Sequence, residues 1–211
     1  MMEPLLLGYV SLTAALVVTP GATTAVVVRN TLASGWRGGI AAAIGAAAGN
    51  STHAAVAGLG LAVLVARIPA LLIGVKIAGG LYLAWLGIGS LRRTILGTPL
   101  PISGAIISGD DSIAHHHALR EGLTVNLLNP AIATFYLAVV PTFVPEGASY
   151  GYYVRLAAIH VGMAFICHAM WAVGMDRLRH LLAHPGARLT LEGLTGAALL
   201  LLAARVLLSI A

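Results

Sequence analysis

The chain of 211 residues carries very little charge. Only 9% of its residues are Asp, Glu, Lys or Arg, whereas a soluble domain has about 25%. Its twelve basic and seven acidic residues give a formal net charge of +5 and stand in short clusters between long apolar stretches. This scarcity excludes an ordinary soluble domain and a basic face for nucleic acid. With 59% hydrophobic residues and a mean hydropathy of +0.93, the composition indicates a polytopic membrane protein.

Cysteine and the common catalytic motifs are also scarce or missing. The single cysteine, Cys167, lies in an apolar segment, which excludes an intramolecular disulfide and a dithiol relay. The sequence has no nucleotide-binding loop and no His-Glu-x-x-His, which are motifs of nucleotide-driven pumps and metalloproteases. We therefore expect neither an enzyme nor a bound cofactor.

Long apolar windows predict the fold class. A spanning helix needs roughly 20 mainly apolar residues, and six windows meet this requirement. We expect an all-α integral membrane protein with six transmembrane helices in the lipid bilayer, at about residues 4–28, 38–66, 70–91, 121–144, 150–174 and 189–210.

The basic residues predict the orientation, because short cytoplasmic loops hold more Lys and Arg than external ones. The first, third and fifth connections hold eight basic residues and the opposite side at most four. Both termini are therefore expected outside. The eight are Arg29, Arg37, Arg92, Arg93, Arg120, Arg177, Arg179 and Arg188.

Residues 92–120 differ in composition from the segments around them, being rich in Gly, Ser, Pro, Asp and His. We interpret them as a flexible cytoplasmic linker between a first three-helix repeat, 1–91, and a second, 121–211. Because each half holds an odd number of spans, related halves must face opposite ways. Such inverted repeats are common in transporters, with the substrate near the midplane where helices break.

Two breaks are predicted, one in the first helix of each half. Proline removes a backbone donor and clashes with the preceding turn, and freed backbone groups in a bilayer need protein or a wet cavity. Simple kinks are the alternative interpretation. A zwitterion suits both the amides and the carbonyls of such breaks. The predicted substrate-binding residues are Thr19, Pro20, Gly21 and Thr23 at the first break, Asn126, Asn129 and Pro130 at the second, and Asn50.

Four consecutive polar residues, 50–53, stand near the middle of the second span. Such residues are costly in a membrane unless they face a cavity or another helix, and both alternatives stay open. Glu121, Asp176 and Glu192 lie near predicted helix ends, so a buried carboxylate relay is not expected. His53 is our proton-coupling candidate, and neutral packing is its alternative role.

His115, His116 and His117 follow two aspartates in the linker. Adjacent histidines cannot reach one ion from a helix, although a flexible loop could gather them around a divalent metal. A solvated linker is the alternative, and we predict no metal site. Gly45 and Gly49 form a small-xxx-small pair that favours close helix packing and makes a homodimer plausible.

Several blocks resemble the bacterial lysine exporter / homoserine and threonine exporter family of amino-acid efflux proteins. The family's proline after Thr19-Pro20-Gly21 is replaced here by Ala22, and its lysine after Asn129-Pro130 by Ala131. The matching blocks are 19–22 (Thr-Pro-Gly-Ala), 35–38 (Gly-Trp-Arg-Gly), 76–87 (Lys-Ile-Ala-Gly-Gly-Leu-Tyr-Leu-Ala-Trp-Leu-Gly), 126–130 (Asn-Leu-Leu-Asn-Pro) and 141–144 (Pro-Thr-Phe-Val).

The resemblance implies a secondary transporter in the bacterial inner membrane that exports an amino acid or a derivative by alternating access. The coupling ion would be a proton or sodium. Divalent-metal efflux and a non-transporting membrane scaffold are the alternative functions.

Overall fold

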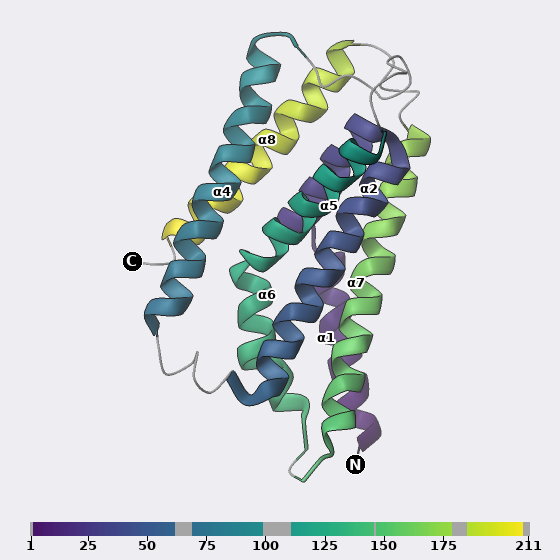
Figure 1. The fold of residues 1–211 in the computed structure, drawn as a ribbon, viewed down its shortest axis with the longest axis vertical. Helices are drawn as coiled ribbons and strands as arrows, with labels where there is room; N and C mark the ends of the chain where they lie inside the picture. The colour runs from purple at the N-terminus through teal and green to yellow at the C-terminus, as the bar shows by residue number, and fades with distance from the viewer. Residues whose placement is uncertain (1, 62–68, 99–110, 146, 179–184, 209–211) are drawn as a thin grey trace.

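The computed structural model describes residues 2–61, 69–98, 111–145, 147–178 and 185–208, which form helices and short connections without a strand. The all-α prediction is thus confirmed for the described residues (Figure 1). In chain order the helices are α1 (Met2–Val18), α2 (Ala22–Val56), η1 (Ala57–Leu61), α4 (Pro69–Ile95), α5 (Asp111–Leu127), α6 (Pro130–Thr134), η2 (Phe135–Val139), η3 (Val140–Phe143), α7 (Tyr150–Leu178) and α8 (Pro185–Leu208).

Both predicted helix breaks are confirmed. Helix α1 ends at Val18 and α2 begins at Ala22, with a bend of 49° between them. Helix α5 ends at Leu127 and α6 begins at Pro130, with a bend of 51°. Proline explains both positions, because it cannot donate the backbone hydrogen bond that would continue the preceding helix.

The predicted connection at 29–37 is shorter than expected, because all of these residues but two keep helical geometry within α2. The chain instead reverses at two residues, Ser34 (φ −129°, ψ 17°) and Gly35 (φ 70°, ψ −173°). A positive φ favours glycine, which has no Cβ to clash. The two arms of α2 then lie side by side, since a Cβ on Gly38 would be 2.8 Å from the carbonyl oxygen of Asn30. The backbone amide of Trp36, at the start of the second arm, donates to Asp176 Oδ1 of α7 (3.1 Å).

Helix α5 packs against the α2 hairpin, and the approach is backbone to backbone. A Cβ on Gly122 of α5 would be 2.8 Å from the carbonyl carbon of Ala42, and one on Gly45 would be 2.8 Å from the amide nitrogen of Leu123. The structure thus confirms the helix-packing interpretation of Gly45. Helix α7 packs on α2, and α4 packs mainly on α8 beside this bundle (Figure 1).

Between two and four elements of the described structure are candidate membrane spans. Within the described residues, α7 and Leu189–Leu208 of α8 are long and apolar enough to cross a bilayer, and each bent pair adds one more if counted as a single span, giving up to four. The 27-residue helix α4 covers the range predicted as the third span. Six spans in two inverted repeats therefore stay a prediction.

The linker predicted at 92–120 is shorter than expected. Helix α4 continues to Ile95 and α5 already begins at Asp111, while residues 99–110 lie outside the described residues. His115, His116 and His117 therefore lie on a helix, where successive side chains point about 100° apart. The alternative in which a flexible loop gathers all three histidines around one metal ion therefore does not apply, because these residues are helical.

Candidate functional site

One side of the first break is exposed at the surface of the protein. Thr19 and Pro20 are exposed, and the Thr19 hydroxyl donates back to the carbonyl oxygen of Ala15 (2.7 Å). Gly21 precedes α2 in an extended conformation, and no side chain caps the helix there. The start of α2 thus presents backbone amides, the groups that bind anions at helix N-termini.

The other side of the first break is buried within the protein. Thr23 and Thr24, in the first turn of α2, are each 6% exposed. The Cys167 thiol of α7 lies 3.5 Å from the carbonyl oxygen of Val17, to which it donates. In an uninterrupted helix this carbonyl would accept from residue 21, so α7 supplies a weak donor to a group that the break frees.

At the second break, side chains of the break itself and of α2 lie within hydrogen-bonding distance of the backbone groups. Asn129 caps α6, because its Oδ1 accepts from the amide of Ala131 (3.0 Å). Pro130 has no N–H for the carbonyl of Asn126, which accepts instead from the Asn129 amide (3.0 Å). His53 Nε2 lies 3.2 Å from the same carbonyl oxygen. Since a carbonyl only accepts, this nitrogen carries the proton.

The polar run 50–53 divides between two roles. Asn126 Nδ2 donates to Asn50 Oδ1 (3.0 Å), and both residues are 1% exposed. Ser51 and Thr52 are exposed and donate to carbonyl oxygens of their own helix. Asn50 therefore contacts another helix, which is one of the two alternatives left open for this run. Ser51 and Thr52 do not face the protein.

A second imidazole lies beyond this break. The His53 ring stacks on Tyr136 with centroids 6.4 Å apart, and the Tyr136 hydroxyl lies 2.8 Å from His160 Nδ1. Tyr136 belongs to the π-helical segment η2, and such segments occur often at functional sites. His160 of α7 is fully buried. Like His53, it stands within a predicted span, here the one at 150–174.

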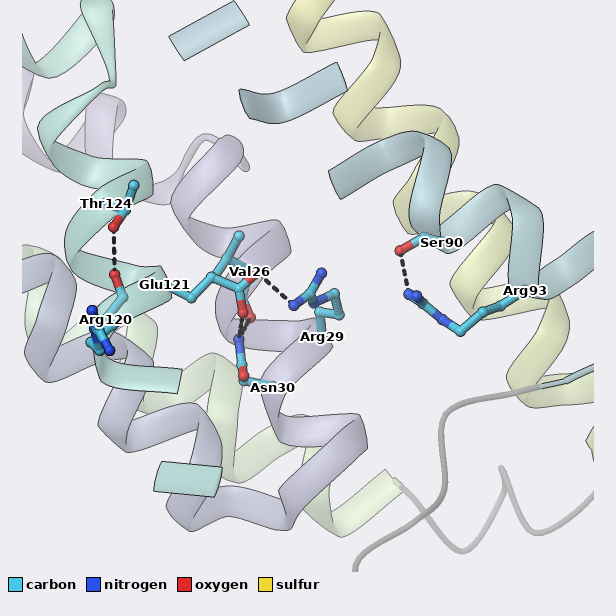
Figure 2. Close-up of polar contacts among 8 residues, drawn as sticks. All are labelled: Val26, Arg29, Asn30, Ser90, Arg93, Arg120, Glu121 and Thr124. Atoms are coloured by element: carbon cyan, nitrogen blue, oxygen red, sulfur yellow. Dashed lines mark hydrogen bonds and ion pairs between the residues drawn. The ribbon is translucent and has the colours of Figure 1, made fainter. Parts of the chain in front are cut away.

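A buried charge cluster joins the two broken elements, and here the sequence prediction was wrong. Glu121 lies inside α5 and is only 3% exposed, not at a helix end. Its Oε1 forms an ion pair with Arg29 Nη2 (2.5 Å). Asn30 Nδ2 donates to Glu121 Oε2 (2.8 Å) and to the Val26 carbonyl (2.9 Å). Figure 2 shows Glu121 reaching from α5 to Arg29 and Asn30 of α2.

A second ion pair links α4 to α8. Arg93 Nε lies 2.9 Å from Glu192 Oε2, and Glu192 is 4% exposed. The Arg93 guanidinium also donates to the Ser90 hydroxyl (3.0 Å) (Figure 2). Glu192 is therefore buried as well, contrary to the expectation from its place near a predicted helix end. This pair stands between the two helices that pack mainly on each other.

The structure thus gathers the predicted residues into two groups. Thr19, Pro20, Gly21 and Thr23 surround the first break; Asn50, His53, Asn126, Asn129 and Pro130 surround the second. Arg29 and Glu121, which join α2 to α5, were not among the predicted site residues. In the part of the chain that the structure describes, no three His, Cys, Asp or Glu side chains are grouped to hold a metal.

A family model described as "LysE type translocator" matches residues 14–210 of the chain. Among similar proteins, the uncharacterized membrane protein YrhP of Bacillus subtilis (strain 168) is 29% identical over 141 residues, which cover 66% of this chain and 67% of that protein. YahN of Escherichia coli (strain K12), also described as an uncharacterized membrane protein, is 32% identical over 120 residues, or 57% of this chain and 52% of YahN.

An uncharacterized membrane protein of Vibrio cholerae serotype O1 is 32% identical over 125 residues, which cover 59% of this chain and 58% of that protein. The matched segments thus span from 52% to 67% of the length of these relatives. No solved structure matches the chain.

Proposed function

The chain belongs to the LysE type translocator family and is a membrane transporter, and from this premise we propose that it exports an amino acid or amino-acid derivative by alternating access. The substrate leaves the cytoplasm across the bacterial inner membrane, with both termini outside. The two halves act as inverted three-helix repeats around a central site.

The matched pair of helix breaks carries this proposal. The breaks bend the chain by 49° and 51°, and each falls in the span that we assign as the first of its half. Within a membrane, irregular backbone is tolerated only where it faces protein or a wet cavity. Transporters hold their substrates at broken helices of this kind, at the interface between repeats. A scaffold has no need of two such breaks.

The chemistry of the breaks favours a zwitterion. The amides at the start of α2 have no side-chain cap from Gly21 and suit a carboxylate. At the second break, Pro130 deprives the Asn126 carbonyl of its helical donor, and this oxygen accepts instead from the Asn129 amide and faces His53 Nε2. A carbonyl oxygen at a break suits an ammonium group, which would compete here with His53. In this proposal Thr19, Thr23, Asn50 and Asn129 line the passage between these ends.

A proton or sodium gradient drives export in this proposal. His53 is the proposed proton-binding group at the second break, because its ring contacts both the Asn126 carbonyl and Tyr136. Loss of the proton dependence of tracer export in His53→Ala, with exchange retained, is the expected result. Unchanged proton dependence would remove His53 from this role.

The testing experiment is an efflux profile. Cells with and without the protein are loaded with amino acids by dipeptide feeding, and the medium is quantified by mass spectrometry. We expect one or a few amino acids to appear outside faster, and Asn129→Ala to abolish the effect. Ser51→Ala is the matched control, since Ser51 is exposed and donates only to its own helix.

Two outcomes would contradict the proposal. If no amino acid moves while a divalent-metal panel shows altered tolerance, the substrate class is wrong and metal efflux takes its place. If neither amino acids nor metals move, the proposal that the two breaks form a transport site is wrong. Reporter tags on each terminus test the orientation separately, and a cytoplasmic N-terminus would overturn it.

A further inference from the structure

We propose that Arg29 and Glu121 form a further binding site for the charged head group of the substrate, separate from its contacts at the two breaks, and that they bind each other when this site is empty. The ammonium group of a zwitterionic amino acid would replace Arg29 at Glu121, and its carboxylate would bind the released guanidinium. This inference rests on the proposed function and names its substrate class: neutral amino acids that carry both head-group charges.

The burial of the ion pair limits what can replace it. The side chain of Glu121 is 2% exposed and that of Arg29 16%. Removing one partner of a buried ion pair is strongly unfavourable, because the other charge is left uncompensated. A ligand that separates the pair must therefore supply one positive and one negative group. A zwitterion does so without changing the net charge of the interior.

The geometry assigns a different part to each member. Glu121 is held by a second donor, since Asn30 Nδ2 contacts its Oε2 (2.8 Å) while also donating to the Val26 carbonyl. Glu121 can thus keep one partner when the guanidinium leaves. Arg29 has the longer, more exposed side chain, so it is the group that moves.

The position of the ion pair links it to both breaks. Arg29 follows the start of α2 by seven residues, about 10 Å along a helix, and Glu121 precedes the end of α5 by six, about 9 Å. The charges therefore lie on the arm of α2 that begins at the first break and on the helix that ends at the second (Figure 2). A head group bound here engages both broken elements at once.

The chain contains a matched control for this inference. Arg93 and Glu192 form a comparable ion pair at 2.9 Å, with side chains 28% and 5% exposed. They join α4 to α8, which pack mainly on each other, rather than the two broken elements. Neutralising Arg93 and Glu192 should therefore leave the choice of head group unchanged.

The test measures binding by the purified full chain in detergent. Thermal stabilisation is titrated with the standard L-amino acids, and then with the carboxamide and N-acetyl derivatives of those that bind. The carboxamide lacks the carboxylate and the N-acetyl derivative lacks the ammonium group. Wild-type protein should bind both derivatives about tenfold or more weakly, since each loses a charged partner.

Variants of the pair should change the preferred charge. Glu121→Gln leaves a positive site, which should favour the N-acetyl derivative, whereas Arg29→Gln leaves a negative one, which should favour the carboxamide. A merely structural ion pair would not produce this reversal. The double variant Arg29→Gln/Glu121→Gln carries no uncompensated charge and should fold, but bind and export the zwitterion about tenfold or more weakly.

The outcomes separate this inference from the proposed function. If the double variant binds and exports amino acids like wild type, the ion pair is structural and the inference fails while export stands. If Arg93→Gln/Glu192→Gln has the same effect as the Arg29/Glu121 double variant, the inference fails too. If wild-type protein neither binds nor exports an amino acid, both proposals fail. Should the single variants not fold, the two double variants decide.

Discussion

The two helix breaks have the same cause but different surroundings. At the first, Thr19 and Pro20 are exposed, and the only side chain that reaches across to a freed carbonyl in the described structure is the weak donor Cys167. At the second, Asn129 caps the new helix and His53 contacts the freed carbonyl of Asn126. Proline can therefore interrupt two helices equally while the fold restrains only one break firmly.

This difference indicates that the two breaks contribute differently to folding and to transport. The second break is part of a packed interface, where the buried amides of Asn50 and Asn126 join α2 to α5. The first leaves the amides of α2 without a side-chain cap. We expect substitutions at the second break to affect folding as well as transport, and those at the first to affect mainly transport.

The largest expected effect on stability comes from substituting a glycine that packs against the second break and comparing it with a glycine at the first. A Cβ on Gly49 would lie 2.6 Å from Asn126 Oδ1, whereas one on Gly21 would meet nothing within 4 Å. Overpacking of this kind costs about 1–3 kcal/mol. Gly49→Ala should therefore lower the thermal-unfolding midpoint in detergent clearly, and Gly21→Ala should not. Equal midpoints would show that the second break is no more tightly packed than the first.

The next effect concerns the buried amide pair. Asn50→Ala leaves the Asn126 Nδ2 donor buried without its acceptor, which costs about 1–2 kcal/mol. Thr52→Ala on the same helix is the control, because Thr52 is exposed and donates to Ala48. A double-mutant cycle with Asn126→Ala should reveal coupling between the two positions. Additive changes would argue against the amide contact.

A smaller effect is expected at the cap of α6. Asn129→Ala removes the acceptor for the Ala131 amide, and loss of such a cap costs about 1 kcal/mol. Asn129→Ser retains a capping oxygen and should restore the unfolding midpoint. If Asn129→Ser folds like wild type yet does not export, Asn129 contacts the substrate as well. If neither variant changes stability, the capping assignment is wrong.

The smallest effect is expected at the first break. Thr19→Val removes an exposed hydroxyl that only donates to Ala15, and exposed changes of this kind stay within about 0.5 kcal/mol. Its unfolding midpoint should match wild type, while export is measured in parallel. A loss of stability as large as that of Asn129→Ala would remove the contrast between the breaks.

The charge clusters show where prediction from sequence stopped. Apolar windows placed the start of the fourth span at Glu121, because the polar residues before it have the composition of a linker. The structure continues α5 back to Asp111, so Glu121 lies inside a helix and becomes buried. Its burial depends on Arg29 and Asn30 of α2, which no local pattern around residue 121 indicates.

The length of the turn in α2 was mispredicted for a related reason. Span lengths require a connection near 29–37, but the residues there are compatible with a helix, and only Ser34 and Gly35 leave helical geometry. Close approach of the two arms replaces a loop, since Gly38 lies against Asn30. The existence of a turn was predictable, whereas its two-residue length depends on packing between the arms.

The sequence by itself determined where the helices break, because Pro20 and Pro130 lack the backbone donor that an uninterrupted helix requires, and this is a local property. Only the tertiary structure decided which groups serve the freed backbone. His53 reaches Asn126 across 73 positions and Cys167 reaches Val17 across 150. Such partners depend on how separate helices pack, so the break at residues 128–129 became the braced one while the break at 19–21 stayed open.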